Sequence, residues 1–246
     1  MKTYIAYFDH LGFKDFIERN DFEMQKRGVG NILRDIENAA ADGKLKDAPY
    51  GVVADLSHTT IQVLNFSDTI LFWTQDDSEE SLTEILKVAY RYNWGATTFF
   101  FPARGALLHG EIQHLNHSSE NDKGGAYHVN SIFGKGLVDV YQKAEASDWS
   151  GATIDTSIIE KIEGFGKEPI EFLKPYAKIY NVPYKNGLFR EEFAFKLCVE
   201  PINEEAFGNV SRNIRENFAN YNKRVDSDGV QRKIQNTIDF LETAKE

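Results

Sequence analysis

The sequence is short of cysteine, of long apolar runs and of positive charge. Its 246 residues include one cysteine, Cys198, so no disulfide forms within the chain and no cysteine cluster binds a metal. No apolar stretch approaches the roughly 18 residues that a membrane-spanning helix needs, and the segment Met1–Phe8 is too short for a signal peptide. We therefore expect a protein of the reducing cytoplasm that does not insert directly into a membrane.

Positive charge is scarce, because 28 lysine and arginine residues stand against 38 aspartate and glutamate residues, a formal net charge of −10. Sequence-independent binding of DNA or RNA needs a basic face that contacts phosphates, so we expect no nucleic-acid partner. A small anionic substrate needs only a local positive site and stays compatible with this balance. The pattern G-x-x-x-x-G-K-[ST] is absent, which excludes a P-loop.

Hydrophobic residues make up 41% of the chain, enough for a sizeable core. Segments rich in β-branched and aromatic residues are mixed with segments of helical spacing. Strands are expected at 3–8, 59–64, 70–74, 97–101, 104–113, 151–155, 176–182 and 193–199, and helices at 14–19, 24–42, 79–93, 133–146, 203–222 and 227–245. This order predicts an α+β fold with helices on one face of a sheet. We expect residues 43–57 to form loops, and residues 114–130 to form either a long hairpin arm or a disordered loop.

Two aspartates stand beside predicted apolar strands. Asp9 follows the strand at 3–8, and Asp68 lies at the tip of the hairpin formed by 59–64 and 70–74. A carboxylate at the end of a buried strand is costly unless it is paired or binds a metal, and two carboxylates with substrate phosphates make a typical Mg²⁺ site. From spacing alone, a helix cap at Asp9 and a turn residue at Asp68 fit equally well.

Three further features carry charge or can bind an anion. The turn Leu11-Gly12-Phe13-Lys14 leads into a helix and would present backbone N–H groups to an anion. Arg104 begins an apolar strand, where it would either clamp phosphate oxygens or pair with an acid at the surface. Asp139 and Lys143 are four residues apart on a predicted helix, a spacing typical of an ordinary solvated ion pair.

Taken in order, these segments resemble the catalytic domain of the class III nucleotide cyclases over residues 3–156. Phe8-Asp9-His10-Leu11-Gly12-Phe13 is similar to the first metal-binding block of that family, and Phe66-Ser67-Asp68 to its hairpin block, with serine in place of glycine. The segment from Arg104 to Gly110 resembles the strand whose arginine binds the triphosphate. The segment from Phe133 to Lys143 resembles the helix at the dimer interface.

The resemblance implies a ferredoxin-like class III cyclase sheet with helices on one face. It makes residues 1–156 the nucleotide cyclase catalytic core, and we expect residues 157–246 to form a C-terminal extension, a hairpin and two helices, packed on that core. It also implies a homodimer whose active sites are built from both protomers.

The resemblance also assigns roles to individual residues. It implies two divalent ions per site, Mn²⁺ or Mg²⁺, held by Asp9, His10 and Asp68. It implies that Leu11, Gly12, Phe13 and Arg104 hold the triphosphate, that Asp139 and Lys143 of the partner chain act in catalysis, and that Leu64 and Ser131 face the base.

Four of these positions depart from the family pattern. The interface helix normally supplies an asparagine and, four residues later, an arginine, where this chain has Asp139 and Lys143. Lysine can place a charge on phosphate but lacks bidentate geometry. The family's adenine-reading lysine and aspartate are replaced by Leu64 and Ser131, which would leave the hydrogen-bonding groups of adenine unpaired. ATP is therefore disfavoured as substrate.

The combined pattern looks most like the pyrimidine cyclases of bacterial Pycsar anti-phage systems. This resemblance implies conversion of UTP to 3′,5′-cyclic UMP and pyrophosphate, with the messenger activating a separately encoded effector. A cytidylate cyclase that converts CTP to cyclic CMP is the alternative. Two further alternatives are a purine or dinucleotide cyclase with an altered pocket, and a degenerate cyclase-like module that binds nucleotide or protein without turnover.

Overall fold

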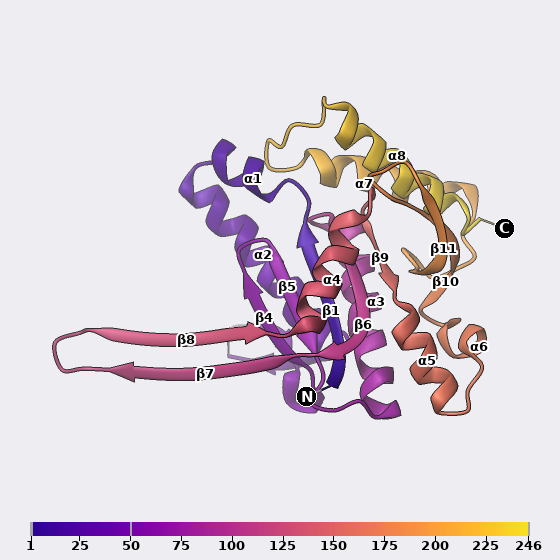
Figure 1. Cartoon of the computed structure of the whole chain (residues 1–246). Helices are drawn as coiled ribbons and strands as arrows, with labels where there is room; N and C mark the ends of the chain where they lie inside the picture. Colours follow the sequence, from indigo (N-terminus) through magenta and orange to yellow (C-terminus); the bar gives the residue numbers. More distant parts are fainter. Residues whose placement is uncertain (1, 50, 246) are drawn as a thin grey trace.

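A seven-stranded sheet forms the centre of the computed structural model, which describes residues 2–49 and 51–245. The strands lie in the order β10-β11-β9-β6-β1-β5-β4 (Figure 1). Their bounds are β1 (Lys2–His10), β4 (Gln62–Phe66), β5 (Thr69–Trp73), β6 (Ala103–Glu111), β9 (Gly151–Ile154), β10 (Ala177–Pro183) and β11 (Phe189–Phe195). Neighbouring strands are antiparallel except β6 and β9, which are parallel.

Helices cover both faces of this sheet. They are α1 (Phe13–Arg19), α2 (Phe22–Ala40), α3 (Glu79–Phe99), α4 (Lys135–Ala146), α5 (Thr156–Gly164), α6 (Pro169–Leu173), α7 (Glu204–Ala219) and α8 (Asp228–Glu242). Alternate side chains of β1 point to opposite faces: Tyr4 and Phe8 pack with α2 and α3, whereas Ile5 and Tyr7 pack with α4. The α+β class is confirmed. The helices are not confined to one face, because β1 is apolar on both of its faces.

The local predictions that were wrong have physical reasons. Residues 43–57 are not only loop, because they contain the short hairpin of β2 (Leu45–Ala48) and β3 (Gly51–Ala54) and a 3₁₀ helix, η1 (Leu56–His58). Helix α3 continues through Thr97 and Thr98, which were expected to form a strand. The Thr98 hydroxyl donates to the carbonyl of Trp94 at 2.8 Å, which satisfies that hydroxyl inside a helix despite the β-branched side chain. Helices α5 and α6 were not predicted.

The C-terminal part of the chain extends the same sheet. Strands β10 and β11 form the predicted hairpin around Gly187, whose φ is +76°, and Phe193 of β11 lies opposite Ile154 of β9. The pairing of β11 starts and ends earlier than the predicted strand at 193–199. Helices α7 and α8 bury a separate apolar cluster in which Trp149 packs on Phe240, with ring centroids 4.9 Å apart. A division of the chain at residue 156 stays a prediction.

A two-stranded arm projects from the body (Figure 1). It consists of β7 (Gln113–Glu120) and β8 (Ala126–Phe133), which pair antiparallel along their whole length. This confirms the hairpin arm over the disordered loop for residues 114–130. Within the described residues, none of the helices combines the length and the apolar character that crossing a membrane requires.

Candidate functional site

Backbone pairing brings Asp9 and Asp68 to one edge of the sheet. Asp9 lies opposite Thr69, and the N–H of His10 donates to the carbonyl of Asp68 at 3.0 Å. Asp68 occupies a two-residue turn with Ser67, whose φ is +57°. Burial raises the pKa of the Asp9 carboxyl above its ordinary value, and the nearby charge of Asp68 adds to this rise. Two close carboxylates of this kind are the protein ligands that a divalent cation requires.

Arg104 binds Asp9 across the sheet. The two residues lie opposite one another on β6 and β1, and Nε and Nη2 of Arg104 donate to Oδ2 of Asp9 at 3.1 and 2.8 Å. Their side chains are only 11% and 14% exposed. The interpretation of Arg104 as a surface arginine is therefore wrong, although it does pair with an acid, and that acid is the predicted metal ligand.

Glu145 and Lys185 complete this charged cluster and were not predicted as site residues. Glu145 of α4 contacts Nη2 of Arg104 through Oε1, and its Oε2 lies 3.1 Å from Nζ of Lys185. Lys185 belongs to the turn between β10 and β11, which the sequence identified only as a turn. Carboxylates and cations thus alternate in the order Asp9, Arg104, Glu145 and Lys185. The first and last of these residues are about 176 positions apart in sequence.

The turn after β1 has the shape that was expected of an anion-binding turn. Gly12 has φ +80° and ψ +18° and precedes the first residue of α1, and no side chain caps this helix. The N–H of Leu11 donates to the carbonyl of Pro102 at 2.8 Å, which fixes the start of the turn. Phe13 packs on Phe16 in the core.

The ring of His10 points into the core and away from the two aspartates. Its Nδ1 lies 3.1 Å from the carbonyl of Phe101 and its Nε2 lies 3.0 Å from the hydroxyl of Tyr92. Burial lowers the pKa of His10 to about 3, so the ring is neutral. The predicted metal contact of His10 is therefore restricted to its backbone carbonyl.

Asp139 and Lys143 do not pair with each other as the sequence spacing indicated. Asp139 is contacted by Lys135, one turn earlier on α4. Nζ of Lys143 lies 3.2 Å from Asp155 and 3.1 Å from Glu192, and its side chain is 16% exposed. Both residues thus make their ion pairs away from Asp9 and Asp68, so one protomer does not assemble all four predicted catalytic residues.

A cavity of about 630 Å³ lies between α4, the β4–β5 hairpin and the base of β8. Leu64 and Ser131, the two positions predicted to face the base, both line this cavity. Most of the wall is apolar or aromatic, and the amide side chains of Asn65 and Asn130 also line it. Among the described residues that line this cavity, none has a charged side chain. The structure therefore brings the two predicted base-facing residues together.

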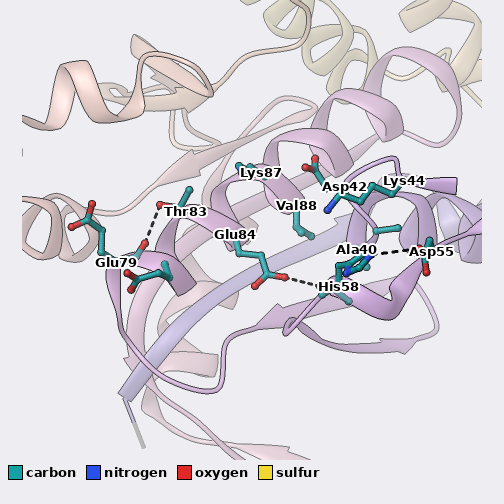
Figure 2. A pocket seen from close by; sticks show the side chains of 13 residues that line it. Ala40, Asp42, Lys44, Asp55, His58, Glu79, Thr83, Glu84, Lys87 and Val88 are labelled. Atoms are coloured by element: carbon teal, nitrogen blue, oxygen red, sulfur yellow. Dashed lines mark hydrogen bonds and ion pairs between the residues drawn. The ribbon is translucent and has the colours of Figure 1, made fainter.

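A second cavity of about 350 Å³ lies between the end of α2, η1 and α3 (Figure 2). Its lining is charged, and two of its carboxylates are already bound. Glu84 accepts hydrogen bonds from Thr59 and Thr60, and Asp42 pairs with Arg91 at 3.1 Å. It lies on the α2–α3 face, whereas the side chain of Asp9 lies on the α4 face, so it is not part of the cluster around the aspartates.

The described residues can hold a metal only with help from a substrate. Among residues 2–49 and 51–245 no group of three or more His, Cys, Asp or Glu side chains could hold an ion. The donor set at Asp9 and Asp68 instead fits Mg²⁺ or Mn²⁺, which take one or two carboxylates together with phosphate oxygens and water. A metal there would also relieve the raised pKa of Asp9.

Comparison with known proteins establishes the fold. No family model and no curated protein match the sequence. The guanylate cyclase domain of RhGC from Catenaria anguillulae, in complex with GTP, matches with a TM-score of 0.51 and 10% identity, over 79% of this chain and 96% of that chain. The catalytic core of a rhodopsin-guanylyl cyclase with converted specificity, in complex with ATPαS, matches with a TM-score of 0.51 and 11% identity, over 79% and 95%.

A non-canonical dimeric guanylyl cyclase domain of the RhoGC fusion protein from the aquatic fungus Blastocladiella emersonii also matches, with a TM-score of 0.50 and 11% identity over 78% of this chain and 93% of that chain. The chain therefore has the fold of the class III nucleotide cyclase catalytic domains, as the resemblance in sequence implied.

Proposed function

We propose that this protein is a metal-dependent nucleotide cyclase that acts on a pyrimidine nucleoside triphosphate, with UTP favoured over CTP. The observation that carries the proposal is the convergence of Asp9, Asp68 and Arg104 beside the Gly12 turn. This convergence occurs in a fold whose solved examples include complexes with GTP and with ATPαS.

The charged groups of the site divide the work of cyclisation. Asp9 and Asp68, with the carbonyl of His10, would hold the divalent ions. When bound, such ions lower the pKa of the 3′-hydroxyl and neutralise charge on the leaving pyrophosphate. The 3′-oxygen loses its proton and forms a bond to the α-phosphorus, and the bond between that phosphorus and the bridging oxygen to the β-phosphate breaks.

Arg104 has to exchange partners during substrate binding. In the structure its guanidinium neutralises Asp9, which would otherwise be a costly unpaired charge. With a divalent ion held at Asp9, the guanidinium of Arg104 would be free to donate to phosphate oxygens. The backbone N–H groups of Gly12 and Phe13 add donors, since that of Leu11 already donates to the carbonyl of Pro102, and Lys185 lies next in the cluster. The protein thus contributes positioning and charge, the main terms in phosphoryl transfer.

The cavity at Leu64 and Ser131 supports a pyrimidine substrate. Leu64 and Ser131 stand where adenylate cyclases have the lysine and aspartate that bind adenine, and they do not take over that role. An adenine in this cavity would therefore lose those hydrogen bonds. Nδ2 of Asn65 donates to the carbonyl of Thr69, and Oδ1 of Asn130 lies 2.6 Å from Nε2 of His114. The Oδ1 of Asn65 and the amide N–H groups of Asn130 are left to serve a base as acceptor and donors.

We further propose a homodimer with shared sites. Exposed apolar side chains, among them Val138 and Tyr141, lie on α4, and one of the structural matches is a guanylyl cyclase domain described as a non-canonical dimer. In this arrangement Asp139 and Lys143 of one protomer approach the substrate held by Asp9 and Asp68 of its partner. The cyclic nucleotide would act as a cytoplasmic messenger in anti-phage defence through a separately encoded effector.

The test is turnover of UTP with Mn²⁺ or Mg²⁺ by the wild-type protein and by D68N, with the product separated by chromatography. We expect cyclic UMP and pyrophosphate in equal amounts from the wild type and neither from D68N. Tight binding of UTP without either product would instead support a nucleotide-binding module, and equal turnover by D68N would refute the metal assignment.

A further inference from the structure

A short segment from the C-terminal part of the chain lies against the Gly12 turn. This strap comprises residues 220–224, between α7 and α8. The backbone N–H and Nε of Arg224 donate to Asp15 of α1 at 2.5 and 3.0 Å. Asn20 donates to the carbonyl of Tyr221 at 2.5 Å. The strap is therefore fixed to both ends of α1.

The strap adopts a strained backbone. Tyr221 and Asn222 have φ values of +60° and +58°, a left-handed conformation that asparagine tolerates but that strains a tyrosine. Contacts compensate for this strain, since the ring of Tyr221 stacks on Phe101 and its hydroxyl accepts a hydrogen bond from Asn31 at 3.0 Å. As a result, the side chain of the next residue points into the interior.

That residue is Lys223, whose side chain passes beneath the turn. A Cβ built on Gly12 would lie 3.1 Å from Cδ of Lys223, and Nζ lies 3.7 Å from the centre of the Phe101 ring. Lys223 is 7% exposed, and its Nζ has no hydrogen-bond partner among the described residues. Burial lowers the pKa of this amine to about 7, and the charge of Asp15 opposes that change.

A buried amine without a partner is costly, and an apolar side chain would fill the same space without that cost. The cation–π contact with Phe101 offsets only part of the free-energy cost of burying this amine. Groups of this kind occur preferentially where an opposite charge arrives during function. Lys223 lies beside the Gly12 turn, so the arriving charge is an anion bound at that turn.

A cavity of about 390 Å³ opens against the same turn. It is lined by Leu11, Gly12, Asp15, Phe218, Lys223, Arg224, Asp226, Ser227, Val230 and Lys233. Of its three cationic side chains, Arg224 is paired with Asp15, and Lys233 with Asp148 at 3.0 Å. Among the described residues, Lys223 is the cation of this wall whose charged group has no hydrogen-bond partner. An anion at the Gly12 turn would therefore meet the amine of Lys223 behind the backbone N–H groups.

We propose that Lys223 is a positioning residue for substrate phosphates: its buried ammonium, delivered by the strap, strengthens the hold of the Gly12 turn on the terminal phosphates of the nucleoside triphosphate. The inference rests on the proposed function and extends it to residues 220–224. Lys223 acts through the turn and does not touch the reacting atoms.

The test compares K223M with K26M. Methionine keeps the length and apolar stem of lysine without the charge, and Lys26 is an exposed lysine on α2. Binding of magnesium pyrophosphate is measured by calorimetry, and KM and kcat for UTP and the Tm are measured in parallel. For K223M we expect KM and the Kd of pyrophosphate to rise about 10-fold, or ~1.4 kcal/mol. We expect kcat to change less and Tm to stay or rise. K26M should match the wild type.

The outcomes separate this inference from the proposed function. Unchanged KM and pyrophosphate binding in K223M, with an active wild type, would overturn the role of Lys223 alone. Loss of folding in both K223M and the shorter polar variant K223Q would also overturn it, in favour of a structural role. A wild-type protein that neither binds pyrophosphate nor cyclises a nucleotide would remove the proposed function itself.

Discussion

Replacing Asp9 by asparagine separates the metal-binding charge of this residue from its part in folding. Asparagine keeps the size of the side chain and an oxygen that can accept from Arg104, but it removes the negative charge. In the wild type, Oδ2 of Asp9 accepts two hydrogen bonds from Arg104 at 3.1 and 2.8 Å. The guanidinium keeps its contact with Glu145 in the variant, so it is not left without a counter-ion.

The cost to folding follows from this geometry. Removing one partner of a fully buried ion pair costs about 3–5 kcal/mol. The pair here is nearly buried, but Glu145 remains, and burial already raises the pKa of Asp9 and so disfavours its charged form. We therefore expect D9N to lose about 1–2 kcal/mol of stability, which lowers Tm by roughly 2–8 °C for a chain of this size. The loss of a metal ligand should lower kcat/KM by at least about 1,000-fold, ~4 kcal/mol.

The assay combines thermal unfolding with turnover of UTP over a series of Mn²⁺ concentrations. D47N is the matched control, because Asp47 is an exposed aspartate on β2, and it should change neither quantity. D9N activity within tenfold of the wild type at every Mn²⁺ concentration, together with a lowered Tm, would refute the reasoning and leave Asp9 with a structural role only.

Three further changes have expected outcomes. Burial raises the pKa of Asp35 from 3.8 to about 7, so between these pH values the folded state holds a proton that the unfolded chain has lost. The free energy of unfolding therefore falls as pH rises from about 4 to about 7. D35N should remove this pH dependence, with a higher Tm than the wild type at pH 8 and an equal one at pH 4. K143M leaves the carboxylates of Asp155 and Glu192 facing each other without a cation and should cost about 2 kcal/mol in urea unfolding, and an unchanged midpoint would contradict this. G12A places a side chain at φ +80° and should cost about 1–2 kcal/mol in the same assay, whereas a neutral effect would show that the turn relaxes freely.

The parts of the site that depend on local pairing could be predicted from the sequence. Asp68 follows from a short polar segment between two apolar segments, and a hairpin that short places its tip beside the neighbouring strand. Asp9 follows from the apolar strand before it. The sequence left open whether the strands that carry the two aspartates are neighbours. The structure pairs β1 with β5, and this pairing brings Asp9 and Asp68 to one edge of the sheet.

The parts that depend on packing between distant segments could not be predicted. Glu145 contacts Arg104, and Lys185 contacts Glu145, only because α4 and the β10–β11 turn come together beside β6. The positions of Glu145 and Lys185 in the sequence form no pattern from which these contacts could be predicted. Lys223 was missed for the same reason. The inward orientation of the His10 ring depends on Tyr92 and Phe101, about 80 and 90 residues further along the chain.

The most direct test of the central claim is a competition among nucleotides. An equimolar mixture of ATP, GTP, CTP and UTP is incubated with the wild-type protein and Mn²⁺, and the cyclic products are identified by mass spectrometry. The cavity at Leu64 and Ser131, with the metal ligands at Asp9 and Asp68, predicts 3′,5′-cyclic UMP as the main product. A main product of cyclic AMP or cyclic GMP would contradict the assignment of the base cavity, and no cyclic product from any of the four would contradict the cyclase itself.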